Sequence, residues 1–414
     1  MELDALRWAL RGTAAYRHVV EEEPLRRVLA LLDKLAAGDG AGAAEDYAGL
    51  FYLLRAEGST SLGAWLDGQL RDRESPYAAL VERGGEDPAL AEAARRDIET
   101  FAALAELGCG RLLEAVGGAA PPELEGMLAR LPRWESTCPF SFAELTEFYR
   151  THGAGLFARH RAFLWEDGVL CPVEEPDCPE PDEMFGYELQ RDQVEANTRA
   201  LLAGSQVNNV LLYGDSGTGK SATVKSLLSL PGFEALRLIE VQKEGLADMP
   251  RLIRTLGGRR LKFILFIDDL AFDQDDKTYS AMKTILEGGL ERRPANVAIY
   301  ATSNRRRLVR QTFSDRAGDE VDASETIEEK TSLADRFGLR IPYLSRDKGE
   351  YLALVDHLAA DAHLAMEPET LHRRAMQWEL RHHGRTPRTA RQLDRKSTRL
   401  NSSHTMQSRM PSSA

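Results

Sequence analysis

The sequence has little cysteine and no excess of positive charge. Four cysteines in 414 residues do not make a disulfide framework, and none stands at the C-x2-C spacing that a zinc site needs. Acidic residues number 65 against 53 Lys and Arg, which gives a formal net charge of −12. General binding to nucleic acid needs clustered positive charge. These absences exclude a disulfide-stabilised mini-protein and a general nucleic-acid-binding chain.

The sequence also lacks a long apolar run. No stretch approaches the roughly 20 apolar residues that cross a bilayer. The N-terminus, Met-Glu-Leu-Asp, has no basic segment followed by an apolar one, as a secretory signal would. We therefore expect a cytoplasmic protein with no membrane partner. An apolar fraction of 43% and a charged fraction of 29% are ordinary for a globular chain, and the length favours two or three domains.

The last stretch of the chain, Asp394–Ala414, differs from the residues before it. It is rich in Ser and Arg, shows no periodicity and follows a helical pattern abruptly. Asp394–His404 and Ser408–Ala414 can be encoded by the two flanks of a common sequencing adapter, with Thr405–Gln407 over its index. We therefore expect residues 394–414 to be an adapter translation that replaces the native C-terminus. The alternative is an ordinary disordered basic tail.

Residues 1–165 have the pattern of an all-α N-terminal domain. They are rich in Ala, Leu, Glu and Arg, and they place apolar residues at helical spacing in Leu25–Ala37 and Asp97–Val116. No chemical motif marks them. Residues 166–182 contain four prolines and seven acidic residues. That composition favours a linker or a wrapping segment over a regular element.

Short apolar runs then alternate with helical patterns. The runs are Asn209–Tyr213, Leu236–Val241, Phe263–Ile267 and Val297–Thr302. Short buried strands separated by helices predict a parallel sheet with helices on both faces. Helical patterns return after Lys348.

A glycine-rich motif joins the first of these strands to the next helix. It reads Gly214-Asp215-Ser216-Gly217-Thr218-Gly219-Lys220-Ser221, directly after VLLY, and satisfies G-x4-G-K-[ST]. The glycines let backbone N–H groups curl around phosphates, and the following helix directs its positive end at them. We expect Lys220 to reach the β- and γ-phosphates of a nucleotide and Ser221 to ligate Mg²⁺. Asp215 and Ser216 would act mainly through their backbone.

Two later strands end in residues that suit nucleotide hydrolysis. FILFIDD ends in two carboxylates, of which Asp268 would hold Mg²⁺ through water and Asp269 would orient the attacking water. VAIYATSN ends at Asn304, whose amide could position the same water. The alternative for Asn304 is an ordinary strand-ending Asn. Because ligands bind at the carboxyl ends of such strands, we expect these side chains to share one site with the glycine-rich loop.

The order of these motifs resembles the AAA+ ATPases, where they are Walker A, Walker B and sensor 1. The stretches FGYELQRDQVEANTRALLAG, LLYGDSGTGKSATVKSLL, ILEGGLERRPANVAIYATSNRR and EEKTSLADRFGL resemble, more narrowly, a bacterial family of predicted AAA+ ATPases of unknown function. The resemblance implies ATP and Mg²⁺ as cofactors. It also implies the fold class: an α/β P-loop NTPase core over 183–332, a parallel sheet with helices on both faces, then an arginine-finger segment and small helical lid over 333–393. The all-α N-terminal domain precedes them.

The resemblance also implies an arginine finger. Ser332–Phe337 is similar to the segment that carries this residue in AAA+ proteins, which makes Arg336 the candidate. Such an arginine stabilises charge on the transferred phosphoryl group and comes from the neighbouring subunit. The chain is therefore expected to form a homo-oligomer, as a ring or a spiral. The alternative is a structural arginine that pairs with Asp335 or another acid.

Two further regions complete the resemblance. Gly384–Gln392 is similar to the sensor 2 region of the lid, with Arg388 the best match and Arg385 and Arg391 as rivals. Phe185-Gly186-Tyr187 is similar to the segment that backs the adenine in this superfamily.

The predicted function is ATP hydrolysis at subunit interfaces that changes the conformation of an unknown protein partner. The loop Gln242–Leu246 has no aromatic residue, which argues against a threading unfoldase. Arg305–Arg307 and Arg310 form a basic cluster, so a DNA-associated ATPase of the initiator or helicase-loader type is an alternative; the cluster is otherwise a solvated face or a subunit contact. Asp269 is shorter than the Glu more often found there in AAA+ proteins, which leaves a non-hydrolysing nucleotide-dependent scaffold as a third class.

Overall fold

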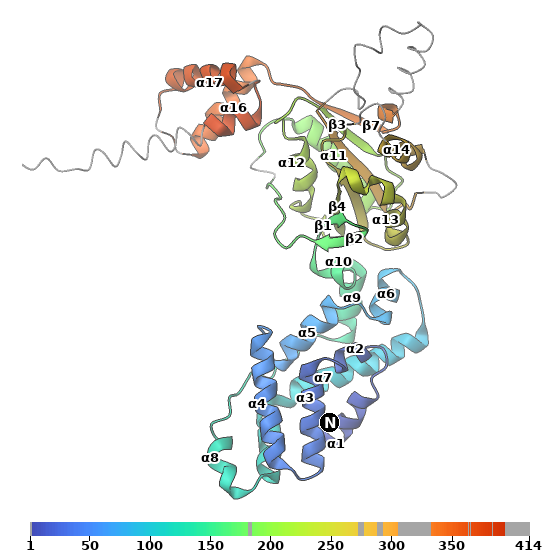
Figure 1. Cartoon of the computed structure of the whole chain (residues 1–414). Coiled ribbons are helices and arrows are strands. Elements are labelled where there is room, and N and C mark those ends of the chain that lie inside the picture. The colour runs from blue at the N-terminus through green and yellow to red at the C-terminus, as the bar shows by residue number, and fades with distance from the viewer. Residues whose placement is uncertain are drawn as a thin grey trace, which may run out of the picture. The chain divides into compact units, whose positions relative to one another are not determined.

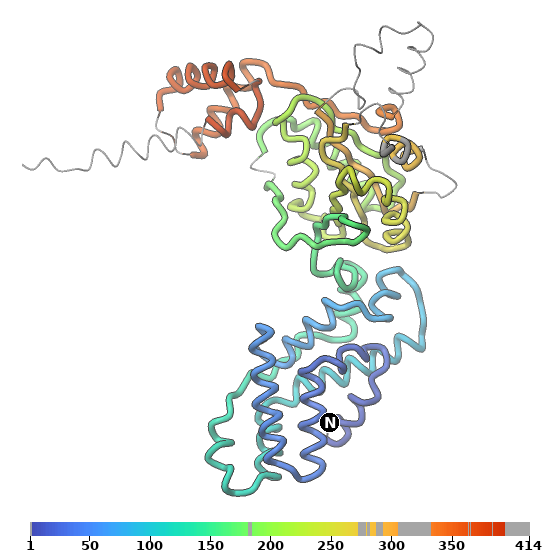
Figure 2. The backbone as a smooth tube through the Cα atoms, in the orientation of Figure 1, coloured from blue at the N-terminus to red at the C-terminus, as the bar shows by residue number. Residues whose placement is uncertain are grey.

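The computed structural model describes residues 2–180, 184–271, 277–287, 293–304, 333–362, 364, 366–382 and 384–393. The chain divides into two compact units. The first comprises Met1–Arg161 and Gly258–Leu261, and the second Ala162–Gly257 and the residues from Lys262 onward. Figure 2 traces the backbone through each unit.

The first unit is built of helices, as the sequence predicts. They are α1 (Leu3–Arg11), α2 (Arg17–Val20), α3 (Glu23–Ala36), α4 (Gly40–Ala56), α5 (Leu62–Asp72), α6 (Pro76–Glu82), α7 (Pro88–Ala119), the 3₁₀ turn η1 (Pro122–Leu124), α8 (Glu125–Leu128), α9 (Phe142–His152) and α10 (Leu156–Arg159). Their apolar faces share one core, in which Leu25, Leu50, Leu66 and Phe101 are fully buried.

Polar caps begin several of these helices. The Asp87 side chain accepts hydrogen bonds from the backbone N–H groups of Ala89 and Leu90 at the start of α7. Pro88 follows the cap and supplies the φ that a first helical position favours. Ser75 caps α6 in the same way, again before a proline. These caps satisfy N–H groups that have no partner within the helix.

A buried carboxylate ties α7 to the turn between α1 and α2. Asp97 is 5% exposed, and its oxygens accept hydrogen bonds from the backbone N–H groups of Ala14, Ala15 and Tyr16 at 2.7–3.3 Å. Burial raises the pKa of Asp97, and the three N–H donors oppose that shift. Since these donors lie more than 80 positions away in the chain, Asp97 fixes the entry to α2 by a tertiary contact.

The second unit is an α/β fold. Its elements are β1 (Ala162–Glu166), β2 (Val169–Pro172), α11 (Glu188–Leu202), β3 (Val210–Gly214), α12 (Lys220–Lys225), η3 (Ser226–Leu228), β4 (Leu236–Val241), η4 (Lys243–Asp248), α13 (Met249–Leu256), β5 (Lys262–Ile267), α14 (Lys277–Glu287), β6 (Val297–Ser303), β7 (Leu339–Tyr343), α16 (Lys348–Asp361) and α17 (Pro368–His382). The strands form one sheet in the order β2-β1-β4-β5-β6-β3-β7. Among the described strands, β1 and β2 pair antiparallel and the other neighbours pair parallel.

Helices cover both faces of this sheet. Val194 of α11 and Val224 of α12 pack with Ile264 and Phe266 of β5 on one face. Phe263, which points to the opposite face, is also 0% exposed. Figure 1 shows α13 and α14 on the other side of the sheet from α11 and α12. The predicted parallel sheet with helices on both faces is therefore confirmed.

The sheet begins earlier than the sequence predicts. Residues 162–165 were expected to be helical and 166–182 to be an irregular linker, whereas β1 and β2 form a hairpin there. Asp167 and Gly168 connect the two strands with φ of +49° and +76°. Two consecutive left-handed residues are typical of a type I′ turn, for which Asp-Gly is a favoured pair. This local turn signal outweighs the prolines that come after it.

A further strand lies at the other edge of the sheet. β7 falls within residues 333–393, where the sequence predicts an arginine-finger segment and a lid. In its sequence, Leu-Arg-Ile-Pro-Tyr, Arg340 and Pro342 are exposed while Ile341 and Tyr343 are buried. An edge strand tolerates proline because one side of its backbone needs no sheet partner.

A small helical lid follows β7, as predicted. It contains α16, α17 and a helical segment at 387–393. Tyr351 and Leu354 of α16 share a core with Ala375 of α17 and with Ala390. Asp347 starts α16 with a reciprocal cap that also involves the Glu350 side chain.

None of the helices in the described part of the chain is both long and apolar enough to span a bilayer.

Asp97→Asn is expected to destabilise the helical unit by about 2 kcal/mol, because the amide leaves some of the three N–H donors without an acceptor. The urea midpoint, followed by circular dichroism, should fall, and the amides of Ala15 and Tyr16 should exchange faster with solvent. Asp87→Asn is the matched control on the same helix, since Asn caps as well as Asp. Unchanged exchange at Ala15 and Tyr16 would contradict the role of Asp97.

Candidate functional site

The loop after β3 has the backbone that its glycines permit. Gly214, Gly217 and Gly219 have φ of +139°, +78° and +98°. Glycine adopts these values without the steric cost that other residues bear. A Cβ on Gly214 would lie 2.0 Å from the carbonyl oxygen of Tyr343, so the loop also packs too closely on β7 for a side chain at that position.

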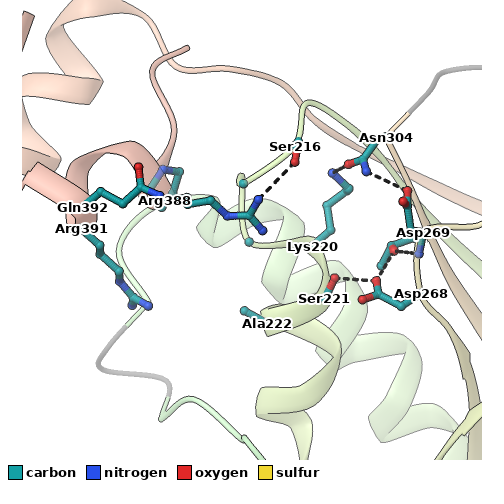
Figure 3. Close-up of a pocket in the computed structure, with 14 residues that line it drawn as sticks. Ser216, Lys220, Ser221, Ala222, Asp268, Asp269, Asn304, Arg388, Arg391 and Gln392 are labelled. Carbon is teal, nitrogen blue, oxygen red and sulfur yellow. Dashed lines mark hydrogen bonds between the residues drawn. The ribbon is translucent and has the colours of Figure 1, made fainter. Parts of the chain in front are cut away.

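The predicted site residues come from three adjacent parallel strands. β5, β6 and β3 are neighbours in the sheet, so their carboxyl ends meet at one edge. Lys220 follows β3 across the loop, Asp268 and Asp269 follow β5, and Asn304 follows β6. Figure 3 shows these side chains gathered around one cavity of about 690 Å³. That volume is within the range of small-molecule sites.

Lys220 lies buried beneath the loop. It is 6% exposed, and its Nζ donates to the carbonyl oxygens of Gly214 at 3.0 Å and Asp215 at 2.7 Å, and to Oδ1 of Asn304 at 3.0 Å. Burial lowers the pKa of Lys220, and nearby carboxylates, that of Asp215 foremost, oppose the shift. The structure thus holds a positively charged side chain at the position where the sequence predicts a residue that contacts phosphate.

Ser221 and Asp268, the predicted metal ligands, are in direct contact. Ser221 Oγ donates to Asp268 Oδ1 at 2.6 Å. The same carboxylate oxygen accepts from Thr302 Oγ1 at 2.5 Å. The Thr302 oxygen in turn accepts the backbone N–H of Asp269 at 2.9 Å. Thr302 is not among the predicted site residues, yet it links both aspartates to β6.

Asp269 has an unusual backbone. Its φ of +50° lies in the left-handed region, and Thr302 secures this turn by accepting from Asp269 N–H and, through its carbonyl, from Leu270 N–H at 2.7 Å. Asn304 Nδ2 donates to Asp269 Oδ1 at 2.7 Å. The Asn304 amide therefore bridges Lys220 and Asp269, as Figure 3 shows.

One of the candidate lid arginines contacts the loop. The backbone N–H of Arg388 donates to the Gly217 carbonyl at 3.2 Å, and its Nη1 lies 3.4 Å from Ser216 Oγ. Arg391 lines the same cavity. Arg385 lies 3.7 Å from Glu379 instead. Of the three candidates, the geometry favours Arg388, with Arg391 beside it.

A second, smaller cavity of about 60 Å³ adjoins the first, because Gly219 and Ala222 line both. Phe185, Gly186 and Tyr187 line it, as do Thr218 of the loop and Leu354 and Leu358 of α16. The segment predicted to back the adenine therefore lies next to the glycine-rich loop.

Arg336 lies elsewhere. Gly214 pairs with Tyr343 and Val210 with Leu339, so the residues before β7 lie at the amino end of the sheet. There Arg336 lines a cavity of about 480 Å³ with Arg293 and Asn209. Its neighbour Asp335 pairs with Arg340 at 2.5 Å. The structure does not bring Arg336 to the Lys220 site of its own chain.

Three predicted features lie outside the described residues: Ser332 of the arginine-finger segment, the basic cluster Arg305–Arg307 with Arg310, and the tail 394–414. Within the described ranges, no group of three or more His, Cys, Asp and Glu is arranged to hold a metal ion.

The middle residues of the loop also act through their side chains. Asp215 Oδ2 accepts from the backbone N–H of Ser345 at 2.8 Å and from its Oγ at 2.6 Å. Sequence reasoning missed this contact, together with the role of Thr302. The sequence did carry a weak signal for both residues: Thr302 and Ser345 are polar and stand at a strand end or just after it.

Comparison with known proteins gives a family for the chain. The model of a family described as "Protein of unknown function (DUF815)" matches residues 158–399, more than half of the chain. Among solved structures, the RuvB Holliday junction branch migration motor of Thermotoga maritima and two of its single-residue variants match at a TM-score of 0.36 and 17% identity. The match covers 55% of this chain and 65% of each of those chains. No curated protein matches the chain.

The Lys220 ammonium is expected to titrate below the ordinary lysine value of 10.5, because burial disfavours its charge. Asp268→Asn should lower that pKa further, since a carboxylate that favours the charged form is removed. Carbon-13 NMR of reductively methylated lysines against pH measures both effects. Lys262, whose pKa is lowered by burial, is the internal control and should not respond to Asp268→Asn. A Lys220 pKa that does not move in the variant would contradict the electrostatic effect of Asp268 on Lys220.

Proposed function

The chain belongs to the family of proteins of unknown function DUF815, and we propose that this member is an AAA+ ATPase that binds Mg²⁺-ATP and hydrolyses it at subunit interfaces. One observation carries the proposal. Lys220, Asn304 and Asp269 form a hydrogen-bonded chain at the carboxyl ends of three adjacent strands, and Ser221 and Asp268 meet beside it. A cation, two carboxylates, a hydroxyl and an amide in one cavity are the groups that phosphoryl transfer to water needs.

The residues present fit a magnesium nucleotide. Mg²⁺ prefers oxygen ligands and is usually held by one or two carboxylates together with phosphate oxygens and water. Ser221 Oγ and Asp268 Oδ1, 2.6 Å apart, offer a hydroxyl and a carboxylate oxygen at one point. Lys220, Arg388 and Arg391 line the same cavity and supply positive charge for the phosphates.

Each side chain then has a distinct role. Lys220 and the N–H groups of the glycine-rich loop bind the β- and γ-phosphates. Ser221 and Asp268 would hold Mg²⁺, which would supply positive charge for the phosphate oxygens. Asp269 orients the attacking water and accepts its proton, while Asn304 holds the Asp269 carboxylate in place. Arg388 brings the lid to the phosphate end through its contacts with the loop.

The base end of the nucleotide is assigned to the smaller cavity. Phe185, Gly186 and Tyr187 form one wall, and Leu354 and Leu358 of the lid contribute apolar surface. The flat faces of a purine base suit such apolar walls. Closure of the lid on the base would give the conformational change that we propose is passed to an unknown protein partner.

The position of Arg336 supports assembly. Since it lies at the amino end of its own sheet, it can serve as an arginine finger only in the site of a second copy of the chain. We therefore propose a homo-oligomer in which the Arg336 face of one subunit meets the Lys220 cavity of the next.

Phosphate release from Mg²⁺-ATP tests the proposal directly. Asp269→Asn should lower turnover by about 10²–10⁴-fold while ATP still binds, because it removes the group that accepts the proton. Lys220→Ala should weaken ATP binding itself. Lys225→Ala, in the same helix and 4.0 Å from Glu240, is the matched control and should keep full turnover. A parent chain that binds ATP and releases no phosphate at any concentration would refute hydrolysis and favour a nucleotide-dependent scaffold.

Mixing two inactive variants tests the interface. Arg336→Ala should lower phosphate release about 10³-fold and spare ATP binding, as the loss of an arginine finger does. Mixed with Lys220→Ala it should regain activity, because an intact loop on one subunit then meets an intact Arg336 on another. Arg199→Ala, which removes an exposed arginine paired with Glu195, is the control for the single variant. Mixtures no more active than their components would place Arg336 outside the mechanism.

A further inference from the structure

The connector between β7 and the lid, Leu344–Arg346, contacts both ends of the candidate nucleotide site. At the phosphate end, Ser345 donates two hydrogen bonds to the Asp215 carboxylate of the loop. At the base end, the Tyr187 hydroxyl donates to the Leu344 carbonyl at 2.6 Å. Two consecutive residues thus anchor segments that are far apart in the sequence.

Arg346 makes the most extensive of these contacts. Its residue exposure is 8%, and its Nη2 donates to the Phe185 carbonyl at 2.6 Å. The guanidinium carbon lies 4.8 Å from the centre of the Tyr187 ring and 5.6 Å from that of Phe185, within cation–π range of both. The backbone N–H of Arg346 donates to the Arg385 carbonyl at 3.3 Å, which ties the connector to the sensor 2 region as well.

The backbone of Phe185–Tyr187, which Arg346 contacts, has a conformation that its own residues do not fix by themselves. Gly186 and Tyr187 have φ of +80° and +58°. A left-handed residue with a side chain is strained and persists only where its surroundings impose it. A Cβ on Gly186 would lie 1.7 Å from Arg346 Nη2, so the guanidinium occupies the space next to that glycine. Stacking of Tyr187 on Tyr343, with ring centres 4.9 Å apart, holds the other side.

We propose that Arg346 is a positioning residue for the base of the nucleotide. It acts through Phe185–Tyr187, the wall of the smaller cavity, and it determines the affinity for a nucleoside triphosphate but not for the triphosphate group alone. This inference rests on the proposed function. Lysine cannot replace Arg346, because it lacks the planar group that stacks on a ring and donates a hydrogen bond at the same time.

Two ligands distinguish binding at the base end of the site from binding at the phosphate end. Isothermal titration calorimetry of the whole chain with Mg²⁺-ATP and with Mg²⁺-tripolyphosphate gives the two affinities. Arg346→Gln and Arg346→Lys should each weaken ATP binding about tenfold, since Gln lacks the charge and Lys lacks the planar donor group, and should leave tripolyphosphate binding unchanged. In the hydrolysis assay the KM for ATP should rise while kcat at saturating ATP stays the same. Arg199→Gln is the matched control and should change neither affinity.

The outcomes distinguish this inference from the function on which it rests. A parent chain that binds neither ligand refutes nucleotide binding itself. A parent that binds both, with an Arg346→Gln variant that loses both affinities equally or neither, refutes the role of Arg346 and leaves the proposed function standing. Tyr187→Phe provides a second variant if Arg346→Gln does not fold. It keeps the ring and removes the hydroxyl that bonds to Leu344 and interacts with Arg346, so a smaller loss confined to ATP supports the inference, and an equal loss of tripolyphosphate contradicts it.

Discussion

Parallel pairing on both sides of β3 is the constraint on which the candidate site depends. Tyr213 pairs with Ser303 of β6, which brings the end of β6 beside the glycine-rich loop. Gly214 pairs with Tyr343 of β7, which brings the connector to the lid against the same loop. β3 and β6 are buried on both faces and β7 on one, so a slip of one residue would exchange the two sets of side chains between faces. The register therefore fixes the positions of the candidate site residues and of the connector to the lid.

Much of this arrangement could be predicted because its signals are local. The motif Gly214–Ser221 contains its own turn residues, and the apolar run Leu236–Val241 coincides with β4. Asp268, Asp269 and Asn304 stand directly after apolar runs, and a parallel sheet brings such ends together without further information. The hairpin at Asp167–Gly168 was also signalled locally, but the prolines that follow it obscured the turn. β7 was missed because its outward positions, Arg340 and Pro342, interrupt the apolar pattern.

The contacts that could not be predicted are those between distant positions. Thr302 meets Asp269 across 33 positions, Ser345 meets Asp215 across 130, and Arg346 meets Phe185 across 161. Each is a single polar side chain with no spacing pattern, and only the completed sheet supplies its partner. Asp215 illustrates the consequence. A carboxylate within a loop that we propose binds phosphate is unfavourable in isolation, but the N–H and hydroxyl of Ser345 direct its charge to the connector.

The left-handed backbone of Asp269 favours a short acidic side chain at this position. Short side chains with a γ-carbonyl, Asp and Asn, are several-fold enriched in this region of conformational space, whereas Glu has no such preference. With φ at +50° and the N–H held by Thr302, the turn itself favours the shorter acid. The aspartate is thus matched to a tighter strand end, in which backbone direction, and not an extra methylene, carries the carboxylate to Asn304. A longer acid at position 269 would therefore need a different backbone conformation at this strand end.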